Sequence, residues 1–150
     1  MLITDNANQR IRVVAASTGT FYGRAMTAGD IYTIAGTGTS GDTGDGGPAT
    51  AAELSDPAAV SAGGAGNVAI ADQGNNRVRV VAESTGTFYG QAMTAGDIYT
   101  IAGTGQAGFS GDGGAATGAQ LSQPDAVAVD PAVNILVADT ANNRIREIGA

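Results

Sequence analysis

Apolar and small residues alternate along several short segments of this sequence, at the two-residue spacing of a half-buried β-strand. In Asp125–Asp130, Val127 and Val129 alternate with smaller residues. Asn134–Ala138 is apolar almost throughout, which is typical of a central strand covered on both faces. Arg144–Ile148, where apolar residues alternate with charged ones, is a third candidate strand.

A fourth candidate strand surrounds the tetrapeptide Ile-Tyr-Thr-Ile, at Asp30–Ala35 and again at Asp97–Ala102. The two copies lie 67 residues apart, and the same offset relates residues 10–38 to residues 77–105, where 26 of 29 positions are identical. The three exceptions are Ile11/Val78, Ala16/Glu83 and Arg24/Gln91. Exposed loops normally tolerate change, so identical loops indicate a recent or deliberate duplication.

Four strands in 67 residues predict one antiparallel sheet per repeat, in an all-β chain. Such a sheet has two faces to cover, and stacking the sheets around an axis covers them, as the blades of a β-propeller do. With strands labelled a to d from the inside, the chain reads b-c-d, then a-b-c-d, then a-b-c. We therefore expect a partial blade at residues 1–38, a full blade at 54–105 and a partial blade at 121–150.

The segment Pro124–Arg146 resembles an NHL repeat, whose pattern is a Val-Ala-Val-Asp strand, a Val-Ala-Asp strand, an Asn-rich turn and an Arg-Ile strand. Val68–Arg79 repeats this pattern and Leu2–Arg12 gives a partial third copy. The resemblance implies propellers of commonly six blades in proteins similar to secreted or cell-surface bacterial ones. The sequence itself assigns no compartment. The spacer Ala82–Gly96 is longer than in the family and predicts an unusual blade edge.

The phase of the repeats predicts unpaired strand edges, which favour pairing with another chain. About two blades per chain would then complete a six-bladed ring, with the chain itself as the main partner. We expect a homotrimer in which the terminal a-b-c unit takes strand d from the next copy. In that ring Leu2–Val14 and Leu136–Ile148 compete for one place, so one terminus would be displaced.

Composition narrows the possible partners and reactions. The chain has 14 acidic residues and 7 basic ones, a net charge of −7 that disfavours a nucleic-acid partner. It has no histidine or cysteine, so the commonest general base, zinc ligand and thiol nucleophile are all missing. No long apolar stretch or basic leader occurs, so we expect no transmembrane helix, signal peptide or membrane partner.

Two glycine-rich segments match the dinucleotide-binding pattern Gly-x-Gly-x-x-Gly, at Gly36–Gly41 and Gly103–Gly108. The pattern binds a pyrophosphate only where a helix begins at the third glycine. Further turn residues follow here instead. The sequence therefore predicts glycine-rich blade connections and no cofactor.

The connection Asp42–Glu53 has the end points of a twelve-residue calcium loop, with a glycine at its sixth position. It lacks oxygen-bearing side chains at positions three and five. The candidate calcium ligands are Asp42, Asp45 and Asp112. A turn in which aspartate caps backbone amides is the favoured interpretation.

Polar residues recur at the turn between strands b and c. They are Asp72, Asn75, Asn76 and Arg77 in the second copy, and Asp139, Asn142, Asn143 and Arg144 in the third. These are the candidate binding residues. Repeated polar residues at a turn serve backbone groups first, so a structural role is favoured. The resemblance likewise implies turn-satisfying Asp and Asn, with Arg bridging to the next blade. The pairs Phe21-Tyr22 and Phe88-Tyr89 are expected to anchor their spacers.

These observations favour a binding or assembly scaffold without catalytic activity, because no serine or threonine has an activating base. Its ligand could be a glycan or a protein. The alternative is a calcium-dependent hydrolase or lactonase with carboxylates at the central channel. That hypothesis is weakened because Asp130 on the inner strand corresponds to Gly63 in the preceding copy. A third interpretation is an engineered or experimental propeller segment that only self-assembles.

Overall fold

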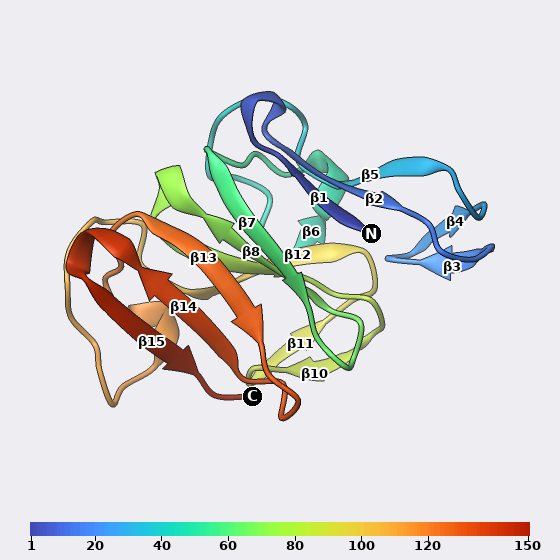
Figure 1. The fold of residues 1–150 in the computed structure, drawn as a ribbon. Coiled ribbons are helices and arrows are strands. Elements are labelled where there is room, and N and C mark those ends of the chain that lie inside the picture. The colour runs from blue at the N-terminus through green and yellow to red at the C-terminus, as the bar shows by residue number, and fades with distance from the viewer.

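The chain folds into three antiparallel sheets that fan out side by side (Figure 1). All 150 residues are described by the computed structural model. The only helices are 3-10 turns of three residues, so none is long or apolar enough to cross a bilayer. The predicted all-β fold of propeller-like blades is confirmed.

The first sheet contains β1 (Leu2–Asp5), β2 (Arg10–Val14) and β5 (Ile31–Ala35), in that order. These are the expected strands b, c and d. The spacer between β2 and β5 folds into a separate hairpin of β3 (Gly19–Phe21) and β4 (Arg24–Met26). The alternation of apolar residues did not predict this hairpin.

The second sheet is the most complete and lies between the other two (Figure 1). It runs from the inner β7 (Pro57–Ala62) through β8 (Val68–Asp72) and β9 (Arg77–Val81) to β12 (Asp97–Ala102). A two-residue strand, β6 (Gly47–Pro48), adds a fifth row outside β12. The connection that leaves the first sheet is therefore built into the outer edge of the second.

The third sheet contains β13 (Pro124–Val129), β14 (Ile135–Asp139) and β15 (Arg144–Ile148), the expected strands a, b and c. A second hairpin of β10 (Gly86–Phe88) and β11 (Gln91–Met93) precedes it, one repeat after the first hairpin. Both pairs of b and c strands thus keep a sheet of their own in this structure.

Short 3-10 turns join strands b and c and lie along the upper left edge of Figure 1. They are η1 (Asn6–Asn8), η3 (Gln73–Asn75) and η5 (Thr140–Asn142). Two further turns, η2 (Ala49–Ala51) and η4 (Ala116–Gly118), lie in the connections between sheets. The two hairpins lie at the opposite edge of the molecule.

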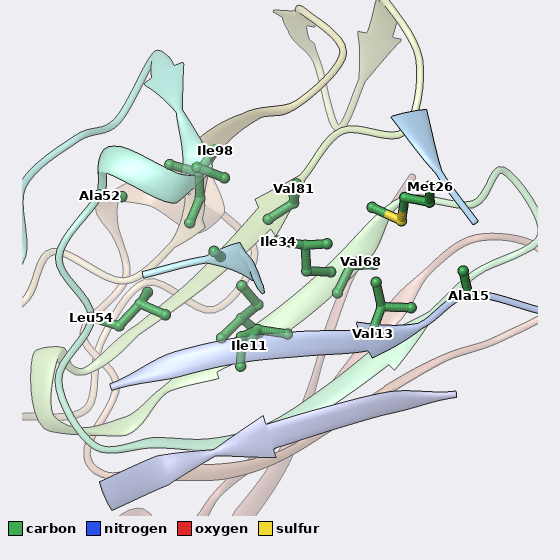
Figure 2. Close-up of a cluster of buried hydrophobic side chains, with 13 residues drawn as sticks. Ile11, Val13, Ala15, Met26, Ile34, Ala52, Leu54, Val68, Val81 and Ile98 are labelled. Carbon is green, nitrogen blue, oxygen red and sulfur yellow. The ribbon is translucent and has the colours of Figure 1, made fainter. Parts of the chain in front are cut away.

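Two apolar layers hold the three sheets together. Figure 2 shows the layer between the first and second sheets, where Ile11 and Val13 of β2 face Val68 of β8 and Val81 of β9. The second layer packs the other face of the second sheet, including Val78 and Val80, against the third sheet. Because side chains alternate along a strand, each face of β8 and β9 serves one neighbouring sheet. The second sheet is therefore covered on both faces.

Candidate functional site

The predicted residues Asp72 and Asn75 lie together at the turn after β8. Asp72 is fully buried, and its carboxylate accepts hydrogen bonds from the Ser55 amide at 2.8 Å and from Asn75 Nδ2 at 2.9 Å. Asn75 also donates to the Gly41 carbonyl at 2.7 Å. Burial raises the pKa of Asp72, more than the hydrogen bonds and Arg79 lower it. These side chains join the turn to the preceding connection, in a structural role.

Arg79, which the sequence analysis did not single out, is the centre of this network. It is fully buried. Its guanidinium donates to the Glu53 carbonyl at 2.8 Å, the Thr43 carbonyl at 3.0 Å and Oδ1 of Asp45 at 2.8 and 3.1 Å. Nη1 also lies 3.5 Å from Asp72. The connection between the first two sheets is thus wrapped around one guanidinium.

The same arrangement recurs one repeat later around Arg146. It donates to the Gln120 carbonyl at 2.7 Å and the Ser110 carbonyl at 2.8 Å, and it pairs with Asp112 at 2.7 Å. Asp139 lies 3.6 Å away and binds its own turn as Asp72 does. Arg146 keeps 12% of its side chain exposed, whereas Arg79 keeps none.

The first copy of this arginine, Arg12, has no connection wrapped around it. Its only ion pair is with Asp5 at 3.8 Å, and 36% of its side chain is exposed. The three arginines therefore form a series from exposed to fully buried. The spacing between Asp45 and Arg79 recurs between Asp112 and Arg146, a signal in the sequence that could have identified the pair.

The calcium candidates are all paired with arginine. Asp45 binds Arg79, Asp112 binds Arg146, and Asp42 lies 3.6 Å from Arg77. No three acidic side chains gather where they could hold a metal ion. A guanidinium occupies the centre of the loop where a calcium ion would sit, so these residues form no cation site here.

The remaining predicted residues have divided roles. Asn76 joins the second sheet to the third, because its Oδ1 accepts from the Gln123 amide at 2.9 Å. Arg77 lies at the outer rim and donates to the Thr104 carbonyl at 3.5 Å. Arg144 stacks its guanidinium 3.6 Å from the ring centre of Phe109.

Asn142 repeats the bonds of Asn75, to the Gly108 carbonyl and to Asp139, whereas Asn143 is exposed. The structure therefore keeps the predicted set near the turns but spreads it over several separate contacts. It does not gather these residues into one site.

One polar hollow lies on the turn edge, at the junction of the second and third sheets. It has a volume of about 260 Å³, and we call it the loop-end hollow. Its lining residues are Asp56, Gln73, Gly74, Asn76, Ala107, Ser122 and Gln123. Alanine is the only apolar residue among them. Asn76 is the one predicted binding residue that reaches this hollow.

Several polar groups at the loop-end hollow have no partner within the protein. The side chains of Gln73, Ser122 and Gln123 make no intramolecular hydrogen bond, and Asp56 makes only a 3.4 Å contact with Gln9 Nε2. Two amides, a hydroxyl and a carboxylate therefore present donors and acceptors to the same space. Gln73 and Gln123 were missed because glutamine in a turn carries no distinctive sequence signal.

The equivalent junction between the first and second sheets is saturated. Gln9, the counterpart of Asn76, accepts from the Asp56 amide at 2.7 Å through its longer side chain. Asn6, the counterpart of Gln73, donates to the Pro57 carbonyl at 2.9 Å. Ser55, the counterpart of Ser122, pairs with Ser40 at 3.0 Å. Free polar groups are thus specific to the second junction.

The predicted aromatic anchors lie at the hairpin turns and contact the following sheet. Tyr22 and Gly23 both have positive φ, which is the geometry of a type I′ turn. The Tyr22 amide donates to Glu83 at 2.9 Å. Burial, followed by the charge of Glu83, raises the pKa of Tyr22 to about 12. In the second hairpin the Tyr89 hydroxyl donates to the Val133 carbonyl at 3.0 Å.

The other candidate chemistry finds no geometric support. After Gly36–Gly41 the chain continues through turns to a 3-10 turn of three residues, so no helix begins at the third glycine. On the inner edge of the third sheet, both oxygens of Asp130 are bound by Asn134, at 2.8 and 3.0 Å. Asp130 is thus occupied as a turn residue.

Neither a family model nor a curated protein sequence matches this chain. Its fold, however, is similar to that of several solved structures. A Bacteroides thetaiotaomicron protein of unknown function matches with a TM-score of 0.71 at 17% identity, over 97% of this chain and 31% of that protein.

Two further solved structures are auxiliary nutrient binding proteins. The one from Bacteroides thetaiotaomicron has a TM-score of 0.61 at 17% identity and covers 99% of this chain. The one from Bacteroides ovatus has a TM-score of 0.63 at 18% identity and covers 99% of this chain. This chain spans 34% of each of these proteins, so it corresponds to about a third of their length. The likeness shows a shared fold.

Proposed function

We propose that this chain is part of a β-propeller binding scaffold of the NHL type, and that the loop-end hollow binds a neutral, polyhydroxylated ligand such as a glycan. The observation that carries the proposal is the set of unpaired polar side chains of Gln73, Ser122 and Gln123 around one hollow. Amides and hydroxyls both donate and accept hydrogen bonds, as sugar hydroxyls do, so the two sets are complementary.

The charge of the hollow favours a neutral ligand over an anion. Asp56 is its only ionisable residue, and no basic side chain lines it. A sulfate, phosphate or carboxylate would meet one negative charge without compensation. A sugar diol could instead donate to the free oxygen of Asp56. The nutrient-binding role of two structural neighbours is consistent with such a ligand, by analogy of fold alone.

The proposed role is non-catalytic. The hollow holds one carboxylate and one hydroxyl, and no histidine, cysteine or lysine occurs in the chain to activate a nucleophile. The acids that a calcium-dependent hydrolase would use are engaged by arginine side chains or by Asn134. Binding without turnover is therefore the function that the geometry supports best.

A glycan array of neutral and acidic oligosaccharides tests this proposal, followed by calorimetric titration of any ligand found. Removing one neutral hydrogen bond costs about 0.5–1.5 kcal/mol, so Gln73→Ala and Gln123→Ala should each weaken binding by about two- to tenfold. Thr87→Ala, on the exposed hairpin at the opposite edge, is the matched control and should leave affinity unchanged.

Two results would contradict the proposal. One is an array without any bound oligosaccharide. The other is a ligand whose affinity is unaffected by both glutamine substitutions. Preferential binding of acidic sugars would contradict the predicted neutrality of the ligand.

A further inference from the structure

The outer strand of the second sheet shows what a complete blade edge contains. β12 lies between β9 and β6, and Ile98 is fully buried in the same apolar cluster as Ala49, Ala52 and Leu54 of the connection. The connection also binds the strand through its backbone, because the Gly46 amide donates to the Ile98 carbonyl at 2.8 Å. The outer strand is thus clamped between a sheet and the connection that precedes that sheet.

The third sheet has the same clamp with nothing in it. β15 pairs only with β14. Between β15 and the preceding connection lies an open slot of about 320 Å³. Its lining includes Ala116, Ala119 and Leu121, which are the counterparts of Ala49, Ala52 and Leu54. Gly113, the counterpart of Gly46, also lines it.

The chain itself contains two strands of the sequence that fills this clamp in the second sheet. β5 and β12 belong to identical Asp-Ile-Tyr-Thr-Ile-Ala segments. β12 is complete in its own sheet, but β5 is not. Ile31 on β5 is 44% exposed, whereas its counterpart Ile98 is fully buried. The apolar side chain that the slot lacks is therefore present, and largely uncovered, at the other end of the chain.

The edge of β15 matches the edge that β5 now uses. β5 pairs with β2, which begins Arg-Ile-Arg, and β15 begins with the same three residues. In the second sheet Ile98 lies opposite Val81 and Tyr99 opposite Val80. Transferred by one repeat, this register places Ile31 of an entering strand opposite Ile148, and Tyr32 opposite Glu147.

We propose that the open slot of the third sheet binds the Ile31–Ala35 strand of a second copy of this chain. The strand would leave its own β2 and add to β15, since burial of Ile31 favours the exchange. Three copies exchanging strands around a ring would close six four-stranded blades, with β1 and β2 of each copy displaced. This inference does not rest on the glycan proposal, because the two sites share no residue.

A synthetic peptide with the sequence of residues 29–36 tests the slot directly. We expect saturable binding of one peptide per chain. A peptide carrying Ile31→Asp should bind about tenfold more weakly or worse, because a carboxylate cannot enter the apolar end of the slot. Absence of peptide binding would overturn the proposal.

The identity of the occupant is tested on the whole chain. Because the chain has no cysteine, the double variant Tyr32→Cys with Glu147→Cys should form disulfides between copies. Thr87→Cys with Glu147→Cys is the mismatched control. Light scattering should show an oligomer, three chains in the ring described above, and Ile31→Asp should reduce it to a monomer.

Each result has a consequence for the proposal. Cross-linking of the 32–147 pair above the control, with oligomer lost in Ile31→Asp, supports it. A chain that binds the peptide but stays monomeric at every concentration would overturn the second copy as the occupant. Glycan binding is measured separately at the loop-end hollow, so the failure of one proposal leaves the other intact.

Discussion

Arg79 and Asp45 are joined by two hydrogen bonds, in which Nε and Nη2 of the arginine donate to one carboxylate oxygen at 3.1 and 2.8 Å. The arginine is fully buried on the second sheet, and the aspartate belongs to the connection from the first sheet. Arg146 repeats the arrangement with slightly more exposure, and Arg12 lacks it. Three copies of one residue thus differ mainly in how completely they are enclosed.

Substituting each of these arginines with methionine should destabilise the fold in the order of their burial. We expect Arg79→Met to lower the free energy of unfolding by about 3–5 kcal/mol, because buried Asp72 and three acceptors lose their partner. Arg12→Met should cost less than about 1 kcal/mol, as for an exposed ion pair. Arg146→Met should lie between them. Urea unfolding followed by circular dichroism measures all three, and equal effects would contradict the assigned roles.

Calcium should leave the protein unchanged. A cation that bound only the folded chain would stabilise it by about 2.7 kcal/mol at a concentration one hundred times its Kd. The loop that resembles a calcium site already surrounds the Arg79 guanidinium, so we expect no shift in melting temperature when calcium is added. A rise that is reversed by a chelator would show a cation site elsewhere.

Tyr22 should ionise later than an exposed tyrosine. Burial and the charge of Glu83 raise its pKa to about 12, from a usual value of 10.0. The folded state holds this proton more tightly, so the stabilisation is complete below pH 10 and is lost as the pH rises from 10 to 12. Phenolate absorbance during an alkaline titration measures the pKa.

Glu83→Gln should lower the pKa of Tyr22 without restoring the usual value, because burial is the larger cause. Tyr22→Phe is the control that removes the late transition and identifies it. An unchanged midpoint in Glu83→Gln would show that the charge of Glu83 has no part in the shift.

Gly103→Ala should be strongly destabilising. Its φ is +95°, and an added Cβ would lie 2.3 Å from the Asn76 carbonyl oxygen, closer than the atoms can approach. We expect a loss of more than about 1 kcal/mol in thermal or urea unfolding. Gly64→Ala is the matched control, since an added Cβ meets nothing within 4 Å there. A loss of stability in both variants would indicate a general response to alanine.

Most of the fold could be predicted from repetition and alternation. The strand Asp97–Ala102 was predicted with the bounds that β12 has, and Arg144–Ile148 with those of β15. These strands carry period-2 patterns that packing on neighbouring sheets reinforces. The grouping of strands into b-c-d, a-b-c-d and a-b-c also follows from the phase of the repeat.

The hairpins and β6 could not be predicted in the same way. Tyr22-Gly23 is an unusual pair for a type I′ turn, because tyrosine rarely adopts positive φ, so the spacer carried no standard hairpin signal. Gly47–Pro48 is only two residues long and pairs with β12 because the connection folds back on the second sheet. Such a strand depends on tertiary packing and leaves no pattern in the sequence.

The candidate site was predicted only in part. Asp72 and Asn75 form hydrogen bonds at their own turn, which local spacing can indicate. Arg79 depends on a connection 34 residues earlier in the chain, and alternation along its strand does not reveal that partner. The free amides of Gln73 and Gln123 are brought together only when two sheets pack.

Wrapping each connection around the arginine of the sheet that follows it has an evolutionary consequence. A duplicated stretch of 67 residues carries both the arginine and the loop that neutralises it, so each new unit arrives with its charge already compensated. Unequal recombination between such copies could lengthen or shorten the gene by whole units without leaving a buried ion alone. Changes in copy number would then be tolerated more readily than point substitutions at Arg79.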